Sequence, residues 1–176
     1  GCLMQYRGPG GSGSGPDDTL LAFPVGSAPA VDGDLSDWPE GTELLLNGST
    51  AGYIHPRSIP TLDDLSGSIR ALWDANNLYL GIAVVDDVIV ADSPDIWRDD
   101  VVELGFDAAD DDKGGGLDDH QVTTNIDGRA TDWERPSPPL TEETGTIPGG
   151  WTMEIAVPCS HPHPATWHAD TNLGFV

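Results

Sequence analysis

The sequence predicts an all-β protein built as an antiparallel β-sandwich, and three observations support this class. Several short stretches alternate apolar and polar residues, which is the period of a half-buried strand. Fifteen prolines and 22 glycines punctuate the segments between them, where the chain must turn. No stretch of useful length has the periodicity of an amphipathic helix. Many short strands separated by turn residues are typical of a sandwich.

The strongest strand signals form a hairpin. Residues 68–73, SIRALW, and residues 77–85, NLYLGIAVV, both alternate, and residues 74–77 between them are turn formers. Alternation puts one set of side chains on the core face. That predicted set is Ile69, Ala71, Trp73, Leu78, Leu80, Ile82 and Val84.

Three later segments are also predicted to be strands: residues 100–107, 120–127 and 151–158. Glu103 falls on the face opposite to its apolar neighbours, so it is predicted to point away from the core. The side chains predicted to point inward are Val102, Leu104, Phe106, Trp151, Met153, Ile155 and Val157.

Charge narrows the classes of partner. Thirty acidic residues face seven basic ones, and the formal net charge is −23. Such a chain repels phosphate backbones and anionic membranes, so nucleic acid is not expected as a partner. The balance is compatible with a cation, with a basic protein surface, or simply with the solvated surface of a secreted protein.

The first 18 residues, GCLMQYRGPGGSGSGPDD, differ in composition from the rest. Gly-Cys followed by Gly, Ser and Pro resembles the processing site of a bacterial lipoprotein, in which Cys2 would be lipidated. The alternative is a disordered tail with an incidental thiol. The sequence thus predicts a flexible tether over 1–18, a domain over 19–176, an extracytoplasmic location, and membrane contact only through a lipid anchor.

Six segments occur together in an order that resembles one known family. They are VDGDLSDWPE (31–40), ALWDANNLYLGIAVVDD (71–87), IWRDDVVELGFD (96–107), DDHQVTTNIDG (118–128), GGWTMEIAVP (149–158) and LGFV (173–176). In combination they are similar to the family 9 carbohydrate-binding modules, which belong to the DOMON-like β-sandwiches. The resemblance covers the chain from about residue 22 to its end, and implies an immunoglobulin/jelly-roll-like, DOMON-like sandwich.

The resemblance also implies a function and three site residues. Modules of this family bind the ends of sugar chains between two tryptophans, with calcium ions supporting the loops. Trp97 matches one stacking tryptophan, and Glu103 matches an acid that hydrogen-bonds sugar hydroxyls. Asn125 falls on a strand position that faces the site.

Two departures from the family pattern affect this expectation. Thr123 stands where the family has an arginine in the strand that holds Asn125. The second tryptophan and the closing strands are expected after LGF, whereas the sequence given ends at Val176. The resemblance therefore predicts either a fragment or a fold completed by another chain.

An acidic, glycine-rich segment over residues 107–120 suggests calcium, which takes six to eight oxygen ligands in flexible geometry. The alternative is a solvated acidic loop, because the spacing of an EF-hand is absent. The candidate calcium ligands are Asp110, Asp111, Asp112, Asp118 and Asp119.

Other cofactors and catalysis are not predicted. Cys159, His161 and His163 are possible transition-metal ligands by type, but no fourth ligand stands at a recognisable spacing. Met153 reads as a core residue rather than a haem ligand. No dinucleotide fingerprint, Walker loop or nucleophile elbow occurs, so neither a nucleotide cofactor nor an enzyme is expected.

Two functional hypotheses remain open. The first is a non-catalytic module that binds carbohydrate through Trp97, Glu103 and Asn125. The second is a lipid-tethered accessory or structural subunit, with a lapsed sugar site, that docks its acidic face on a membrane or envelope protein complex. Both predict that Trp97 is at least partly exposed in the isolated domain.

Overall fold

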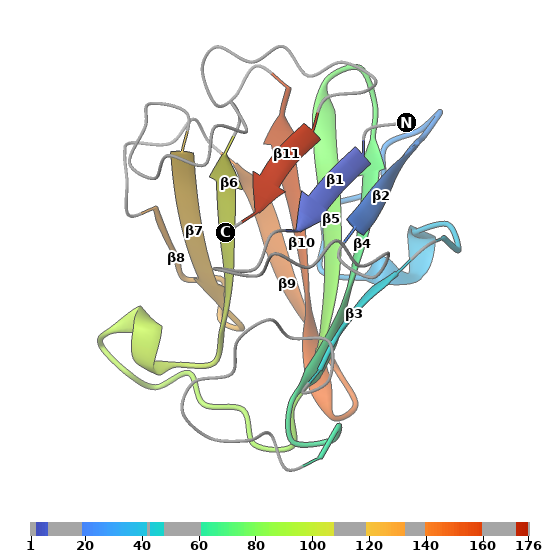
Figure 1. Cartoon of the computed structure of the whole chain (residues 1–176). Coiled ribbons are helices and arrows are strands. Elements are labelled where there is room, and N and C mark those ends of the chain that lie inside the picture. Colours follow the sequence, from blue (N-terminus) through green and yellow to red (C-terminus); the bar gives the residue numbers. More distant parts are fainter. Residues whose placement is uncertain are drawn as a thin grey trace.

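A computed structural model describes residues 3–6, 19–41, 43–47, 61–107, 119–132, 140–159 and 172–175 (Figure 1). Two short 3-10 helices lie on the connections, η2 (Leu35–Asp37) and η3 (Ile96–Arg98). The remaining elements are strands, and this confirms the all-β prediction. They are β1 (Leu3–Tyr6), β2 (Thr19–Pro24), β3 (Leu44–Leu46), β4 (Ser66–Trp73), β5 (Asn77–Val85), β6 (Val101–Asp107), β7 (Asp119–Asn125), β8 (Ala130–Asp132), β9 (Thr141–Ile147), β10 (Gly150–Pro158) and β11 (Asn172–Phe175).

The strands form two layers that share β2 (Figure 1). One layer has the order β8-β7-β6-β11-β1-β2, and the other has the order β2-β4-β5-β10-β9, with β3 also paired to β4. Most neighbours are antiparallel, as predicted, but β1 pairs with β11 and β2 pairs with β4 in parallel. The chain is therefore a sandwich whose layers are joined by backbone hydrogen bonds along one side.

The core lies between the layers and contains the side chains that alternation placed there. Trp151, Met153 and Ile155 of β10 have no exposed surface, and Leu80 of β5 has none either. Leu104 and Phe106 of β6 face them from the other layer, with exposed fractions of 5% and 4%. Burying each such side chain contributes about 1.5–3 kcal/mol, so this cluster is the main source of stability.

The predicted hairpin is present and its turn is held by one carboxylate. The backbone N–H groups of Asn76 and Asn77 donate to Asp74 Oδ1, and the hydroxyl of Tyr79 donates to Asp74 Oδ2. Burial pushes the pKa of Asp74 upward, but these three donors outweigh burial and lower the pKa. β4 and β5 then pair without a break from Trp73–Leu78 to Ser66–Val85.

A second apolar cluster covers the outer face of β4, β5 and β10, where the alternation predicts solvent. The strap, residues 25–41, lies across this face and buries Trp38 against Leu72, Tyr79 and Ala156. Glu154 of β10 is fully buried beneath the strap. Its Oε1 accepts a hydrogen bond of 2.5 Å from Trp38 Nε1. Its Oε2 accepts from the backbone N–H groups of Asp32 and Gly33. The segment VDGDLSDW thus holds the strap against the outer face of β4, β5 and β10.

The N-terminal residues take part in the sheet to a greater extent than their composition predicts. Residues 3–6, within the predicted tether, form β1, which pairs with both β2 and β11. Cys2 and residues 7–18 lie outside the described residues. Lipidation at Cys2 therefore stays a prediction. No helix in the described part of the chain is long and apolar enough to span a bilayer.

The side of the sandwich opposite to β2 is closed by side chains that reach between β7 and β9. Thr124 Oγ1 of β7 donates a hydrogen bond of 3.0 Å to Glu142 Oε2 of β9. Thr144 Oγ1 donates to the carbonyl oxygen of Ile126, just beyond β7. Burial raises the pKa of Glu142, the Thr124 hydroxyl lowers it, and the nearby charge of Glu143 raises it, so that the net shift is upward.

This upward pKa shift predicts a gain in stability when the charge of Glu142 is removed. A carboxyl whose pKa is raised by folding stabilises the fold below its unfolded pKa, and this contribution is lost as the pH rises through the folded pKa. Glu142→Gln is therefore expected to raise the free energy of unfolding at pH 7 and to lose that advantage near pH 4. Urea unfolding at both pH values checks this. Glu143→Gln, which removes the same charge from an exposed position, should gain less, and an equal gain would contradict the prediction.

Candidate functional site

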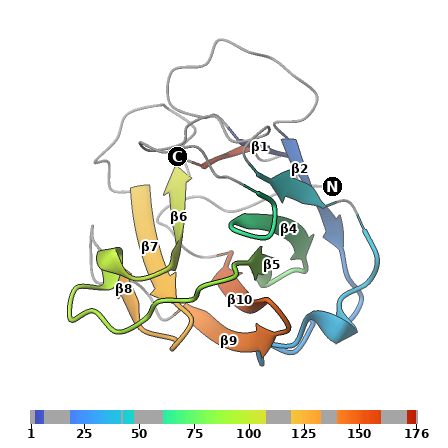
Figure 2. The same ribbon diagram turned by 90° about the horizontal axis from the view of Figure 1, so that it is seen from below.

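Trp97 lies on the connection between β5 and β6, residues 86–100, which crosses from one layer to the other at one end of the sandwich (Figure 2). The connection is fastened at both ends. The backbone N–H of Asp86 donates to the carbonyl of Gly149, and Val90 exchanges hydrogen bonds with Asp100. Ile96 anchors the single turn of η3 with an exposed fraction of only 4%.

The exposure of Trp97 shows that its side chain is not part of the core. Its exposed fraction is 56%, and this confirms the predicted partial exposure. The adjacent Ile96 takes the buried position, because the two side chains leave the helical turn in different directions. Trp97 is therefore a surface aromatic, and three other apolar residues of the same connection are also exposed. These are Val88, Ile89 and Val90.

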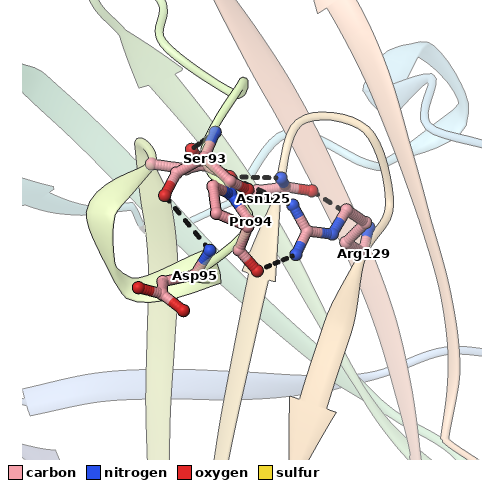
Figure 3. A network of polar contacts seen from close by, with 6 residues as sticks. Ser93, Pro94, Asp95, Asn125 and Arg129 are labelled. Carbon is pink, nitrogen blue, oxygen red and sulfur yellow. Dashed lines mark hydrogen bonds and ion pairs between the residues drawn. The ribbon is translucent and has the colours of Figure 1, made fainter.

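A polar network lies beneath the part of the connection that carries Trp97. Asp99 is buried, with an exposed fraction of 7%, and its Oδ1 accepts a hydrogen bond of 2.8 Å from the backbone N–H of Ser93. Its Oδ2 accepts from Asn125 Nδ2 at 3.1 Å and lies 3.5 Å from Arg129 Nη1. Figure 3 shows the side chain of Arg129 reaching towards Ser93 and Pro94. It donates to their carbonyl oxygens at 2.7 and 3.2 Å.

The hairpin turn between β7 and β8 presents Arg129 to this network. The N–H of Gly128 donates to the carbonyl of Asn125, and Gly128 has a φ of +70°, a conformation that glycine adopts without strain. The N–H of Asn125 donates to the carbonyl of Arg129, and the N–H of Arg129 donates to Asn125 Oδ1. The Asp-Gly pair in NIDGR therefore marks a tight hairpin turn with Arg129 at its end.

Glu103 lies on the outer face of β6, exposed, as its place in the alternation predicts. It pairs across the strands with Thr123, whose Oγ1 donates to Glu103 Oε2 at 3.4 Å. Asn125 lies on the same face of β7, one strand repeat further along, which is about 7 Å. The structure therefore puts Glu103, Thr123 and Asn125 on one face, with the connection that carries Trp97 at the Asn125 end of it.

The three predicted ligand-binding residues differ in how accessible they are. Trp97 and Glu103 are exposed, whereas Asn125 is fully buried. Both polar atoms of the Asn125 side chain are engaged, one with Asp99 and one with the N–H of Arg129. Asn125 therefore supports the surface from below, and the accessible pair is Trp97 with Glu103.

Carboxylates are concentrated where the connection joins β6. Burial raises the pKa of Asp100, the N–H of Val90 lowers it, and the neighbouring charges of Asp86 and Asp99 raise it, with a net upward shift. Even so, in the part of the chain that the structure describes, no group of three or more His, Cys, Asp or Glu side chains is placed to hold a metal ion. Asp86, Asp99 and Asp100 are nevertheless close enough for their charges to interact.

Several predicted residues fall outside the described part of the chain. The candidate calcium ligands Asp110, Asp111, Asp112 and Asp118 belong to this group, as do His161 and His163. Asp119 begins β7, but its side chain is not described. The calcium site therefore stays a prediction. Cys159 lies partly buried just after β10, and Met153 lies in the core as predicted.

A shallow hollow of about 210 Å³ lies on the other layer, between the strap and β2. Phe23, Pro39 and Leu72 line it together with Arg70, and Arg70 forms an ion pair with Glu43. This hollow is on the outer face of β4, whereas Trp97 stands on the connection to β6. It is thus separate from the connection that carries Trp97.

The sequence did not indicate Asp99 and Arg129 as members of the site. Asp99 is one of many aspartates in an acidic chain, and Arg129 follows a turn whose partner loop is 35 residues distant in sequence. The Asp-Gly turn signal predicts a hairpin there. No sequence pattern shows which loop the side chain beyond such a turn will contact.

Known proteins share this architecture. A family model described as "Carbohydrate family 9 binding domain-like" matches residues 31–175. Endo-1,4-beta-xylanase A of Thermotoga neapolitana is 28% identical over 92 residues, which are 52% of this chain and 8% of that protein. The chain thus spans less than a tenth of this curated relative.

Two solved structures of a family 9 carbohydrate binding module from Caldicellulosiruptor kristjanssonii are also similar. The complex with cellotriose has a TM-score of 0.60 and 22% identity, over 79% of this chain and 67% of that one. The complex with glucose has a TM-score of 0.59 and 21% identity, over 78% and 68% of the two chains. At this level of identity the similarity concerns the fold.

Proposed function

Because the chain belongs to the carbohydrate family 9 binding domain-like family, we propose that it is a non-catalytic module that binds the ends of glycan chains on the surface formed by Trp97 and Glu103. The observation that carries this proposal is the exposed Trp97 on a connection that is braced from beneath. Hydrogen bonds with Asp99 and Arg129 fix the backbone near Trp97, and this supports a role for the exposed indole.

The chemistry of the surface suits a sugar ring. One face of a pyranose presents C–H groups, which pack against the face of an indole ring and bury apolar area there. The ring hydroxyls need acceptors, and a carboxylate offers two oxygens that accept charge-assisted hydrogen bonds. Trp97 supplies the first contact and Glu103 the second. Thr123 carries a hydroxyl next to Glu103 and fixes the orientation of that carboxylate.

The chemical class of the ligand is suggested by the relatives. The two solved structures are complexes with cellotriose and with glucose, and the curated relative is named an endo-1,4-beta-xylanase. We propose β-1,4-linked glucan or xylan ends as the ligand class. Such polymers lie outside the cytoplasmic membrane, and this supports the extracytoplasmic location expected from the sequence.

Calorimetry with cellotriose and xylotriose tests the proposal. The native chain is expected to bind at least one of them at micromolar to millimolar concentration, and Glu103→Gln to weaken binding, because an amide accepts through only one oxygen. Asp63→Asn, which removes one charge at an exposed position of another loop, is the matched control. No heat with either sugar at millimolar concentration would contradict the function and favour the alternative of a docking subunit.

Calcium remains part of the proposal, on the acidic composition of residues 107–120. A ligand bound only by the folded chain stabilises it, by about 2.7 kcal/mol at a hundredfold excess over its Kd. Chelator is therefore expected to lower the Tm by about 5–10 °C for a chain of this size. Excess calcium should restore the Tm and magnesium should not. A melting curve that chelator leaves unchanged would remove calcium from the proposal.

A further inference from the structure

We propose that Asp99, Asn125 and Arg129 are positioning residues that hold the connection carrying Trp97 in its binding conformation before any ligand arrives. This inference rests on the proposed function and adds to it a group of residues that touch no ligand. It predicts that removing Arg129 loosens a surface more than 30 residues away in the sequence. The three residues are called the latch below.

Asp99 is the centre of the latch. Its side chain has no exposed surface, although a carboxylate is costly to bury without partners. One oxygen holds the N–H of Ser93, and the other holds Asn125 and Arg129. Trp97 lies between Ser93 and Asp99 in the chain. A single buried carboxylate therefore fixes the two ends of the short segment from which Trp97 projects.

Arg129 fastens the same segment by its backbone. Its guanidinium donates to the carbonyl oxygens of Ser93 and Pro94 and lies beside Asp99, so three acceptors share one planar group. The fixed fork of a guanidinium suits several acceptors in one plane, whereas the ammonium of lysine is a compact point charge. Lysine is therefore not expected to replace Arg129 in this role.

Asn125 connects the latch to the sheet. It closes the hairpin turn by accepting from the N–H of Arg129, and it donates from its side-chain amide to Asp99. Its N–H and carbonyl are held in the turn as well. A chain of hydrogen bonds thus fixes the segment that carries Trp97 relative to β7. The same strand also carries Thr123, the partner of Glu103.

The consequence for binding is preorganisation. A loop that must be ordered by its ligand loses conformational entropy at that moment, and the affinity falls accordingly. A connection fixed by the latch has already lost that freedom on folding. We therefore expect Arg129→Met to weaken saccharide binding tenfold or more, with Arg129→Lys only partly restoring it.

Two readouts on the full chain test this inference. Amide hydrogen exchange of residues 93–100 reports the order of the segment without ligand, and calorimetry with cellotriose reports affinity. Arg70→Met is the matched control, because it removes the same charge from a half-buried arginine whose partner is Glu43 on the other layer. We expect Arg129→Met to speed exchange over 93–100 and to raise the Kd for cellotriose, and Arg70→Met to leave both as in the native chain.

The possible results separate this inference from the proposed function. Exchange over 93–100 that is unchanged in Arg129→Met overturns the latch and leaves the sugar site standing. Faster exchange with an unchanged Kd shows that the latch orders the loop without positioning Trp97 for binding, which also overturns the inference. A native chain that binds no saccharide refutes the proposed function, and the positioning role with it, before any variant is made.

Discussion

Replacing Trp97 by alanine is expected to leave the fold intact and to weaken saccharide binding by about 2 kcal/mol or more, roughly thirtyfold in Kd. The side chain is 56% exposed, so its loss leaves no cavity in the core. It is also the aromatic face on which the proposed sugar ring would stack. Calorimetry with cellotriose and urea unfolding of the same preparations measure the two effects separately.

Ile96→Ala is the matched control, since the two residues are neighbours on η3 with opposite exposures. Ile96 is 4% exposed, and its truncation should cost about 2–5 kcal/mol of stability. If Trp97→Ala destabilised the fold as much as Ile96→Ala does, Trp97 would be a packing residue and the proposed surface would lose its central contact.

Gly33→Ala is expected to lower the free energy of unfolding by about 3–5 kcal/mol. Gly33 has a φ of +83°, which a residue with a Cβ adopts at a cost. The added Cβ would also lie 2.5 Å from the carbonyl oxygen of Thr144, a backbone atom of a paired strand. The strap would have to move, and its hydrogen bonds to Glu154 would move with it.

Gly149→Ala separates the two causes. Gly149 has a φ of +74°, but a Cβ there would meet nothing within 4 Å. Its replacement should cost only the conformational penalty, about 1 kcal/mol. Thermal unfolding of both variants gives the difference, which is the contribution of close packing at Gly33. Equal losses of stability in the two variants would mean that the strap moves at little cost, and that close packing at Gly33 does not hold it on the outer face.

The alternation of side chains predicted the central strands well, because each of these strands packs one apolar face on the core. Trp151, Met153 and Ile155 are the clearest case. The same rule failed for Glu154, which lies on the other face of β10 and is nevertheless fully buried. Its burial depends on the strap, which comes from more than a hundred residues earlier in the chain. A local pattern contains no information about such a cover.

Edge strands and distant pairings could not be predicted for a related reason. β9, TEETGTI, contains two glutamates, so it lacks the apolar run of a core strand, and its place is given by pairing with β10. β1 pairs with β11 from opposite ends of the sequence, and this parallel pairing leaves no local signal.

For the candidate site, the sequence led to the exposed Trp97 and Glu103. Their role in sugar binding stays a prediction. The supports Asp99 and Arg129 became visible only from the hydrogen bonds of the fold.

The sharing of β2 by both layers makes the two sides of the sandwich unequal. On the β2 side, the layers are joined by ladders of backbone hydrogen bonds. β8 and β9 stand at the two ends of the strand order, and contacts such as Thr124–Glu142 and Thr144–Ile126 join that side. Side-chain contacts break at a lower free-energy cost than a ladder of backbone hydrogen bonds. The layers are therefore joined more firmly on the β2 side than on the side of β8 and β9. Slow opening of the sandwich should therefore begin at the contacts between β7 and β9 rather than at β2.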